Sequence, residues 1–140
     1  MSQMPPPPPG QMPPQGGAPA PAGAPGSNKN LYTILAWALF PPIGSLIFLF
    51  VGKDDPDVKN NAANATLVHG AMLVVYIVLW IISAIIWPLA ILATIWGFIW
   101  FIVWLIGLIL ALQAGGRRVN FPLLGNMVAS YVPMVEGWAK

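Results

Sequence analysis

The chain has 140 residues, of which 57% are hydrophobic and 7% are charged, and its formal net charge is +2. Soluble domains average about 25% charged residues, so these few charges cannot cover a water-facing surface, and a soluble single-domain enzyme is excluded. The small net charge does not indicate nucleic-acid binding. The lack of cysteine excludes disulfides, thiol nucleophiles and thiolate metal sites. We therefore expect an all-α integral membrane protein with a polar tail.

The first 30 residues form a low-complexity segment rich in proline and glycine, which includes the run Pro5–Pro9. Such a composition cannot bury enough apolar surface to offset its ordering entropy, so residues 1–30 are predicted to be a disordered tail with local polyproline II character. A partner with an SH3-like or WW-like groove could bind this tail weakly. We favour a solvated tail, because no basic or aromatic residue flanks the prolines.

The first uncharged segment, residues 31–51, has about the 20 residues that a helix needs to cross a ~30 Å hydrocarbon core. Pro41 and Pro42 lie in its middle, and Gly44 and Ser45 follow. Membrane helices tolerate proline where neighbours satisfy the freed carbonyls. We therefore predict a kinked transmembrane helix, and we interpret the kink as a packing feature because no ionisable group accompanies it.

A polar hinge follows over residues 52–66. Asp55 is predicted to be a helix N-cap, Pro56 the first helical residue, and Asp57 favourable at the positive end of the helix dipole. Apolar residues then recur at helical spacing opposite a polar face, which predicts a short interfacial helix over about residues 56–66. Its apolar face is Val58, Ala62 and Ala65, and its polar face is Lys59, Asn60 and Asn61.

The longest uncharged run, residues 67–112, is too long for one membrane helix. As a single helix it would extend about 69 Å, more than twice the hydrocarbon core. The run must fold back, and Pro88 marks the turn, beside Trp87, a residue type that suits a membrane interface. We predict spans near residues 67–87 and 90–112.

The C-terminal part begins with Gly115 and Gly116, which should stop the last span. Arg117 and Arg118 are predicted to be headgroup anchors, because they suit both the helix C-terminus and lipid phosphates. A helical stripe from Pro122 predicts an interfacial helix over about residues 122–132, with a short fourth span as the alternative, before a short tail at 136–140.

Three spans place the hinge and the C-terminus on one side of the membrane and the tail and the Pro88 turn on the other. Five positive residues lie on the first side against Lys29 alone on the second. The positive-inside rule then predicts that the hinge and C-terminus are cytoplasmic, in a bacterial cytoplasmic membrane.

Two groups of side chains in the spans are candidate ligand sites. His69, the one histidine of the chain, could bind a metal, haem or pigment. It has no second ligand at suitable spacing, so we interpret it as a hydrogen-bonding partner of a neighbouring helix. Trp96, Trp100 and Trp104 repeat every fourth residue on one helix face and could line a quinone or lipid site, but we favour packing and interface anchoring as their role.

Small residues four apart indicate close helix packing in the last span. They serve either the internal hairpin or a homo-oligomer. The residues are Ala93, Gly97, Gly107, Ala111 and Gly115.

Two sequence patterns resemble a known family. They are the hinge GKDDPDVK from Gly52 to Lys59 and the closing pattern AGGRRVNFPL from Ala114 to Leu123, on either side of a two-span hairpin. Over about residues 31–130 the chain resembles a bacterial multi-pass membrane domain of unknown function that is related to the twenty-kilodalton Tic subunit of the chloroplast protein-import machinery. In that family a histidine and a glutamine are usual where this chain has Asn61 and Asn64. The resemblance implies a helical multi-pass fold and a distant relation to a protein-conducting component.

The function expected from the sequence is that of a non-enzymatic scaffold or accessory subunit of a membrane complex, with the lipid bilayer and other membrane proteins or copies of itself as partners. An oligomeric channel or a Tic-type translocation component is the alternative, in which several chains would form the pore. We expect no catalytic residue, cofactor or metal, because the spans hold no carboxylate pair and no nucleophile beside a base.

Overall fold

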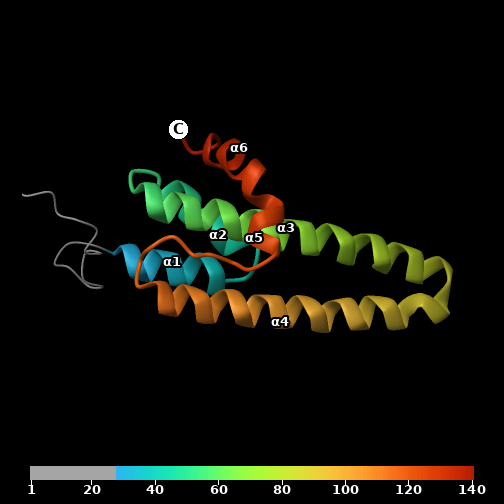
Figure 1. Ribbon diagram of the computed structural model, residues 1–140. Helices are drawn as coiled ribbons and strands as arrows, with labels where there is room; N and C mark the ends of the chain where they lie inside the picture. The colour runs from blue at the N-terminus through green and yellow to red at the C-terminus, as the bar shows by residue number, and fades with distance from the viewer. Residues whose placement is uncertain (1–27) are drawn as a thin grey trace, which may run out of the picture.

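The structure, a computed structural model, describes residues 28–140, and every regular element in that range is a helix. The predicted disordered tail lies outside the described residues over positions 1–27. The six α-helices and two short 3₁₀ helices (Figure 1) are α1 (Lys29–Ala38), α2 (Ile43–Val51), α3 (Pro56–Ile85), η1 (Trp87–Leu89), α4 (Ala90–Ala114), α5 (Leu124–Val128), η2 (Ala129–Tyr131) and α6 (Val132–Glu136).

A long hairpin of α3 and α4 is the largest feature of the described residues (Figure 1). The 30 residues of α3 extend about 45 Å and the 25 residues of α4 about 38 Å. Both arms of the hairpin are long and apolar enough to cross a membrane. The turn between them is η1, which contains Pro88. The chain is therefore an all-helical protein with two candidate membrane spans in residues 28–140.

α3 is continuous from the hinge into the membrane segment. It begins at Pro56, so the predicted interfacial helix and the predicted second span are parts of one helix. The reason is that nothing breaks it: no proline follows Pro56 before Pro88, and Gly70 is the one glycine of α3. At the start of α3, Asp55 is the N-cap, and its carboxylate accepts hydrogen bonds from the amides of Asp57 and Val58 at 2.9 and 3.1 Å.

The predicted first span over residues 31–51 is not a single helix. α1 ends at Ala38, and α2 starts at Ile43 and returns alongside α1. The segment therefore forms two short helices, of ten and nine residues, and not one helix of membrane length. Pro41 and Pro42 supply no amide hydrogen to continue α1. Gly44 allows the sharp return, because a Cβ atom there would overlap the carbonyl oxygen of Leu39.

The C-terminal segment contains short helices in place of the predicted helix over 122–132. α5, η2 and α6 have five residues or fewer each, and they lie across α3 (Figure 1). Val132 and Val135 are buried against the cluster that contains Leu49 and Ala63. Pro133 lies in the first turn of α6, where proline is favourable at a helix start and has no amide hydrogen to extend a helix from the preceding residues. Within residues 28–140 this segment does not supply a fourth span.

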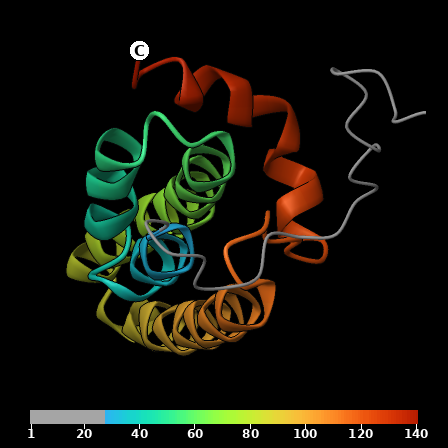
Figure 2. The same cartoon turned by 90° about the vertical axis from the view of Figure 1, so that its left-hand side faces the viewer.

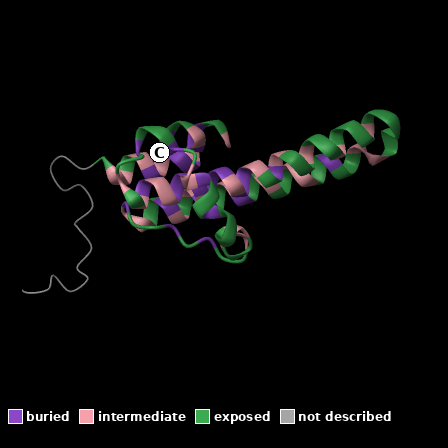
Figure 3. Ribbon diagram, turned by 90° about the horizontal axis from the view of Figure 1, so that it is seen from above, coloured by how far each residue is buried: buried purple, intermediate pink, exposed green. Residues whose placement is uncertain are grey.

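The buried core lies at one end of the hairpin. There α1 packs against α2, α3 and α4, as the view along the hairpin shows (Figure 2). The other half of the hairpin is mostly exposed (Figure 3). It carries large apolar side chains that the protein does not cover, including Val74, Trp80, Ile81, Ile85 and Phe98. Such a surface is stable in lipid and would be an aggregation hazard in water.

The charged residues gather at the end of the hairpin away from η1. We call this region the charged end: it comprises the start of α1, the hinge 52–55, the start of α3 and residues 115–118. Lys29 lies beside Asp57 there, with its Nζ atom 2.7 Å from a carboxylate oxygen. The predicted topology puts Lys29 and the Pro88 turn on the same side, whereas the structure places Lys29 at the end of the α3–α4 hairpin away from η1, because α1 turns back before it reaches η1.

Candidate functional site

Ion pairs join three parts of the chain at the charged end. Asp57 of α3 accepts hydrogen bonds from Lys29 of α1 at 2.7 Å and from Nε of Arg118 at 3.0 Å. Lys29 also lies 3.7 Å from a carboxylate oxygen of Asp55. The hydrogen bond to Asp57 raises the pKa of the Lys29 ammonium above its usual value. These contacts bring the predicted cap residues and one predicted headgroup anchor into a single cluster.

The other predicted anchor, Arg117, has a different role in the structure. Its Nε atom donates to the carbonyl oxygen of Ala114 at 3.0 Å, at the C-terminus of α4. There the positive guanidinium lies at the negative end of the helix dipole, which is a favourable interaction. Gly115 ends the helix with φ 59°, in the left-handed region that suits glycine.

Asn61 of α3 forms hydrogen bonds with α1 and with the segment that follows α4. Its amide nitrogen donates to Oγ1 of Thr33 at 3.0 Å and to the carbonyl oxygen of Arg117 at 2.8 Å, and its side-chain oxygen accepts from the amide of Val119 at 2.7 Å. Asn61 is fully buried. The sequence predicts that it lies on an exposed polar face, which is wrong because α1 and residues 117–119 cover that face.

A shallow polar pocket of about 350 Å³ lies between α3 and the C-terminal segment. Asn60 donates to a carboxylate oxygen of Glu136 at 2.9 Å across it, and Asn64 donates to the carbonyl oxygen of Asn60 at 3.1 Å. The amide groups and Arg118 offer hydrogen-bond donors, and Glu136 offers an acceptor.

His69 is buried and bonded to the tryptophan stripe. The indole N–H of Trp100 donates to Nδ1 of His69 at 3.1 Å, so the proton of the neutral imidazole is on Nε2. Trp37 of α1 packs edge-on against the imidazole, with ring centroids 5.5 Å apart. Within the described part of the chain, no group of three or more His, Cys, Asp or Glu residues is placed to hold a metal ion.

The three tryptophans of the stripe join α4 to α3 and α1 through their indole nitrogens. Trp96 donates to the carbonyl oxygen of Met72 at 2.9 Å, and Trp104 donates to that of Ala38 at 3.2 Å. With the bond from Trp100 to His69, each indole in the stripe has a partner on another helix. The stripe is thus a set of interhelical contacts.

The small residues of α4 provide room for side chains of the same chain. Gly107 faces Trp37, and a Cβ atom on Gly107 would overlap the Trp37 ring. Ala111 is fully buried in the same cluster, and Ala93 lines a cavity with Tyr76 of α3. Gly97 has more space. Sequence reasoning did not single out Trp37, since spacing on α4 cannot reveal which residue of α1 fills the gap.

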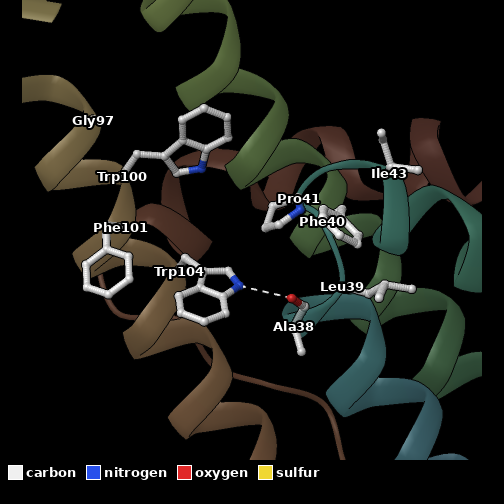
Figure 4. A pocket seen from close by; sticks show the side chains of 9 residues that line it. All are labelled: Ala38, Leu39, Phe40, Pro41, Ile43, Gly97, Trp100, Phe101 and Trp104. Carbon is white, nitrogen blue, oxygen red and sulfur yellow. Dashed lines mark hydrogen bonds between the residues drawn. The ribbon is translucent and has the colours of Figure 1, made fainter. Parts of the chain in front are cut away.

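An apolar pocket of about 670 Å³ lies between the α1–α2 turn and the middle of α4 (Figure 4). Trp100, Phe101 and Trp104 form its α4 side, and the turn residues form the other (Figure 4). No charged residue lines it. The full lining is Ala38, Leu39, Phe40, Pro41, Ile43, Gly97, Trp100, Phe101 and Trp104.

Comparison with known proteins corrects the predicted resemblance. A family model described as the magnetosome magnetite crystal formation protein family (MamF/MmsF) matches residues 28–128. This family is not the Tic-like one, so the predicted relation to chloroplast import is wrong. The prediction of a translocation component depended on that relation and is therefore no longer supported. The patterns on which the resemblance was based are short hinge and loop signals around an apolar hairpin, and they are poorly specific one by one. No curated protein and no solved structure matches the chain.

Proposed function

We propose, since the chain belongs to the MamF/MmsF magnetosome magnetite crystal formation protein family, that it is a non-enzymatic accessory protein of the magnetosome membrane and acts in magnetite crystal formation. The match over residues 28–128 is the observation that carries this proposal, because it includes both long apolar helices and the charged end.

The distribution of polar groups supports an accessory role. The far half of the hairpin exposes apolar side chains suited to lipid, whereas the ion pairs and the polar pocket lie at the charged end. Contacts with other proteins of the magnetosome membrane are therefore assigned to the charged end and the C-terminal helices. In this role the chain positions other components and performs no chemical step itself.

The non-enzymatic part of the proposal is tested at His69. In the variant His69→Asn the side-chain oxygen can still accept the hydrogen bond from Trp100, but the group can no longer transfer protons or ligate metal as an imidazole does. We expect cells that carry His69→Asn to form crystals like those of the wild type. Loss of crystal formation with a normally folded His69→Asn protein would contradict the non-enzymatic role.

The role in crystal formation is tested by deleting the gene in its magnetite-forming host. Electron microscopy of the deletion strain should show crystals altered in size or shape, and the wild-type gene should restore them. A fluorescent fusion should lie along the magnetosomes. Unaltered crystals in the deletion strain would refute the proposed function.

A further inference from the structure

We propose that α1 and α2 form a re-entrant helical hairpin, which enters the lipid bilayer beside α3 and α4 and turns back within it. The start of α1, the hinge and the C-terminal segment then all lie on one side of the membrane, and η1 lies on the other. The surface of this hairpin contacts lipid acyl chains.

Both ends of the α1–α2 hairpin are held at the charged end. The start of α1 is bonded to Asp57 through Lys29, and the backbone of Asn30 lies against Gly116 at the end of α4. α2 runs directly into the hinge through Gly52, which packs on Val58. No ion pair or hinge of this kind can join groups on opposite sides of a ~30 Å hydrocarbon core.

The tip of the hairpin lies about halfway along α4. The indole of Trp104 bonds the carbonyl oxygen of Ala38, and Trp104 precedes the end of α4 at Ala114 by ten residues. Ten helical residues extend about 15 Å, which is also the length of α1 and half of the hydrocarbon thickness. The tip therefore reaches the middle of the bilayer when α3 and α4 span it.

The outer surface of the hairpin is suited to hydrocarbon. The sequence has no charged residue between Lys29 and Lys53. Phe40 at the tip is 77% exposed and Ile43 is 61% exposed. Exposed apolar side chains continue along α2, and the tip shares an apolar pocket with α4, whose own apolar side chains are exposed. Because the same lipid would cover both hairpins, we assign lipid rather than a separate partner protein as the occupant of this surface. Its other members are Leu31, Ile47, Phe50 and Val51.

Several polar backbone groups near the tip have partners within the turn, which lowers the cost of placing a turn at membrane depth. The carbonyl oxygen of Pro42 accepts from the hydroxyl of Ser45 at 2.6 Å. The amide of Gly44 donates to Leu39 at 3.0 Å, and that of Ile43 donates to Phe40 at 2.7 Å. The two prolines have no amide hydrogen to satisfy. The apolar pocket between the tip and α4 (Figure 4) then opens to the bilayer interior, where an acyl chain fills it.

Single cysteines test the topology, since the natural chain has none. Asn28→Cys, Asp54→Cys and Trp87→Cys place exposed thiols at the start of α1, at the hinge and at η1. A membrane-impermeant maleimide is applied to sealed magnetosomes and then to the same sample in detergent. In the sealed sample we expect Asn28→Cys and Asp54→Cys to be both labelled or both protected. Trp87→Cys should then show the other result, because η1 lies on the other side of the membrane. Opposite labelling of Asn28→Cys and Asp54→Cys would overturn the proposal.

A cysteine at the tip tests insertion. Phe40→Cys, or Ile43→Cys should the first variant misfold, is expected to lose labelling in sealed magnetosomes and to regain it in detergent. Labelling of the tip in the sealed sample at the rate of Asp54→Cys would place the hairpin in water and overturn its insertion. These outcomes do not depend on the crystal phenotype, so the topology and the proposed function can fail separately.

Discussion

The contact between α1 and α4 gives the sharpest stability prediction. A Cβ atom on Gly107 would overlap the ring of Trp37, which is fully buried and stacks on Phe121 with ring centroids 5.6 Å apart. Overpacking costs about 1–3 kcal/mol, whereas alanine is favoured over glycine in a helix by about 0.5–1 kcal/mol. The difference between these two effects is about 0–2.5 kcal/mol, so we expect Gly107→Ala to lower the free energy of unfolding by about 1 kcal/mol.

The assay is thermal unfolding of the purified full chain in mild detergent, followed by circular dichroism. Gly97→Ala is the matched control on the same helix, because its Cβ atom would lie 3.8 Å from the nearest atom, on the Tyr76 ring. We expect Gly97→Ala to melt at or above the wild-type temperature and Gly107→Ala below it. Should Gly107→Ala melt like the wild type while chemically crosslinked oligomers are lost, Gly107 would serve contacts between copies and the reasoning would be refuted.

Three further predictions concern buried and charged polar groups. Asn61→Ala should lower the free energy of unfolding by about 2–4 kcal/mol, because it removes three hydrogen bonds at a buried site, whereas Asn64→Ala should cost less than about 1 kcal/mol; equal melting temperatures would contradict this. His69→Leu leaves the Trp100 indole unpartnered and should cost about 1–3 kcal/mol, more than His69→Asn, and the reverse order in a melting assay would disprove the bond. Lys29→Met should cost at most about 1 kcal/mol, since the ion pair is partly exposed. The pKa of Lys29 is raised above 10.5, so the pair stabilises the fold below that pH, and the cost should vanish as pH rises through the higher folded-state value. A cost that persists unchanged in alkaline melts would contradict that assignment.

Local signals made parts of the fold predictable. The length of the uncharged run requires a fold-back, and Pro88 is its strongest break, which is where η1 lies. The N-cap at Asp55 follows from an Asp-Pro pair that opens a helical segment. In each case the deciding groups are close neighbours in sequence.

The remaining features depend on contacts between distant segments. Residues 31–51 have the hydropathy and length of a span, and only the packing of α1 against α4 shows that the two prolines reverse the chain. The hydrogen-bond partners of Asn61 are Thr33, Arg117 and Val119, which lie 28, 56 and 58 positions away from it in the sequence. No periodicity within α3 can therefore show that Asn61 is buried. The tryptophan spacing predicted one helix face but could not identify His69 and Ala38 as the acceptors on the helices that this face contacts.

The crystal size distribution in cells that carry a single version of the gene tests the central claim most directly. The versions are wild type, Gly107→Leu, and Gly70→Ala, whose added Cβ atom would meet no atom within 4 Å. If the folded chain acts in magnetite crystal formation, Gly70→Ala cells should have wild-type crystals and Gly107→Leu cells the altered crystals of the deletion strain. Wild-type crystals in both the deletion strain and the Gly107→Leu strain would contradict the claim.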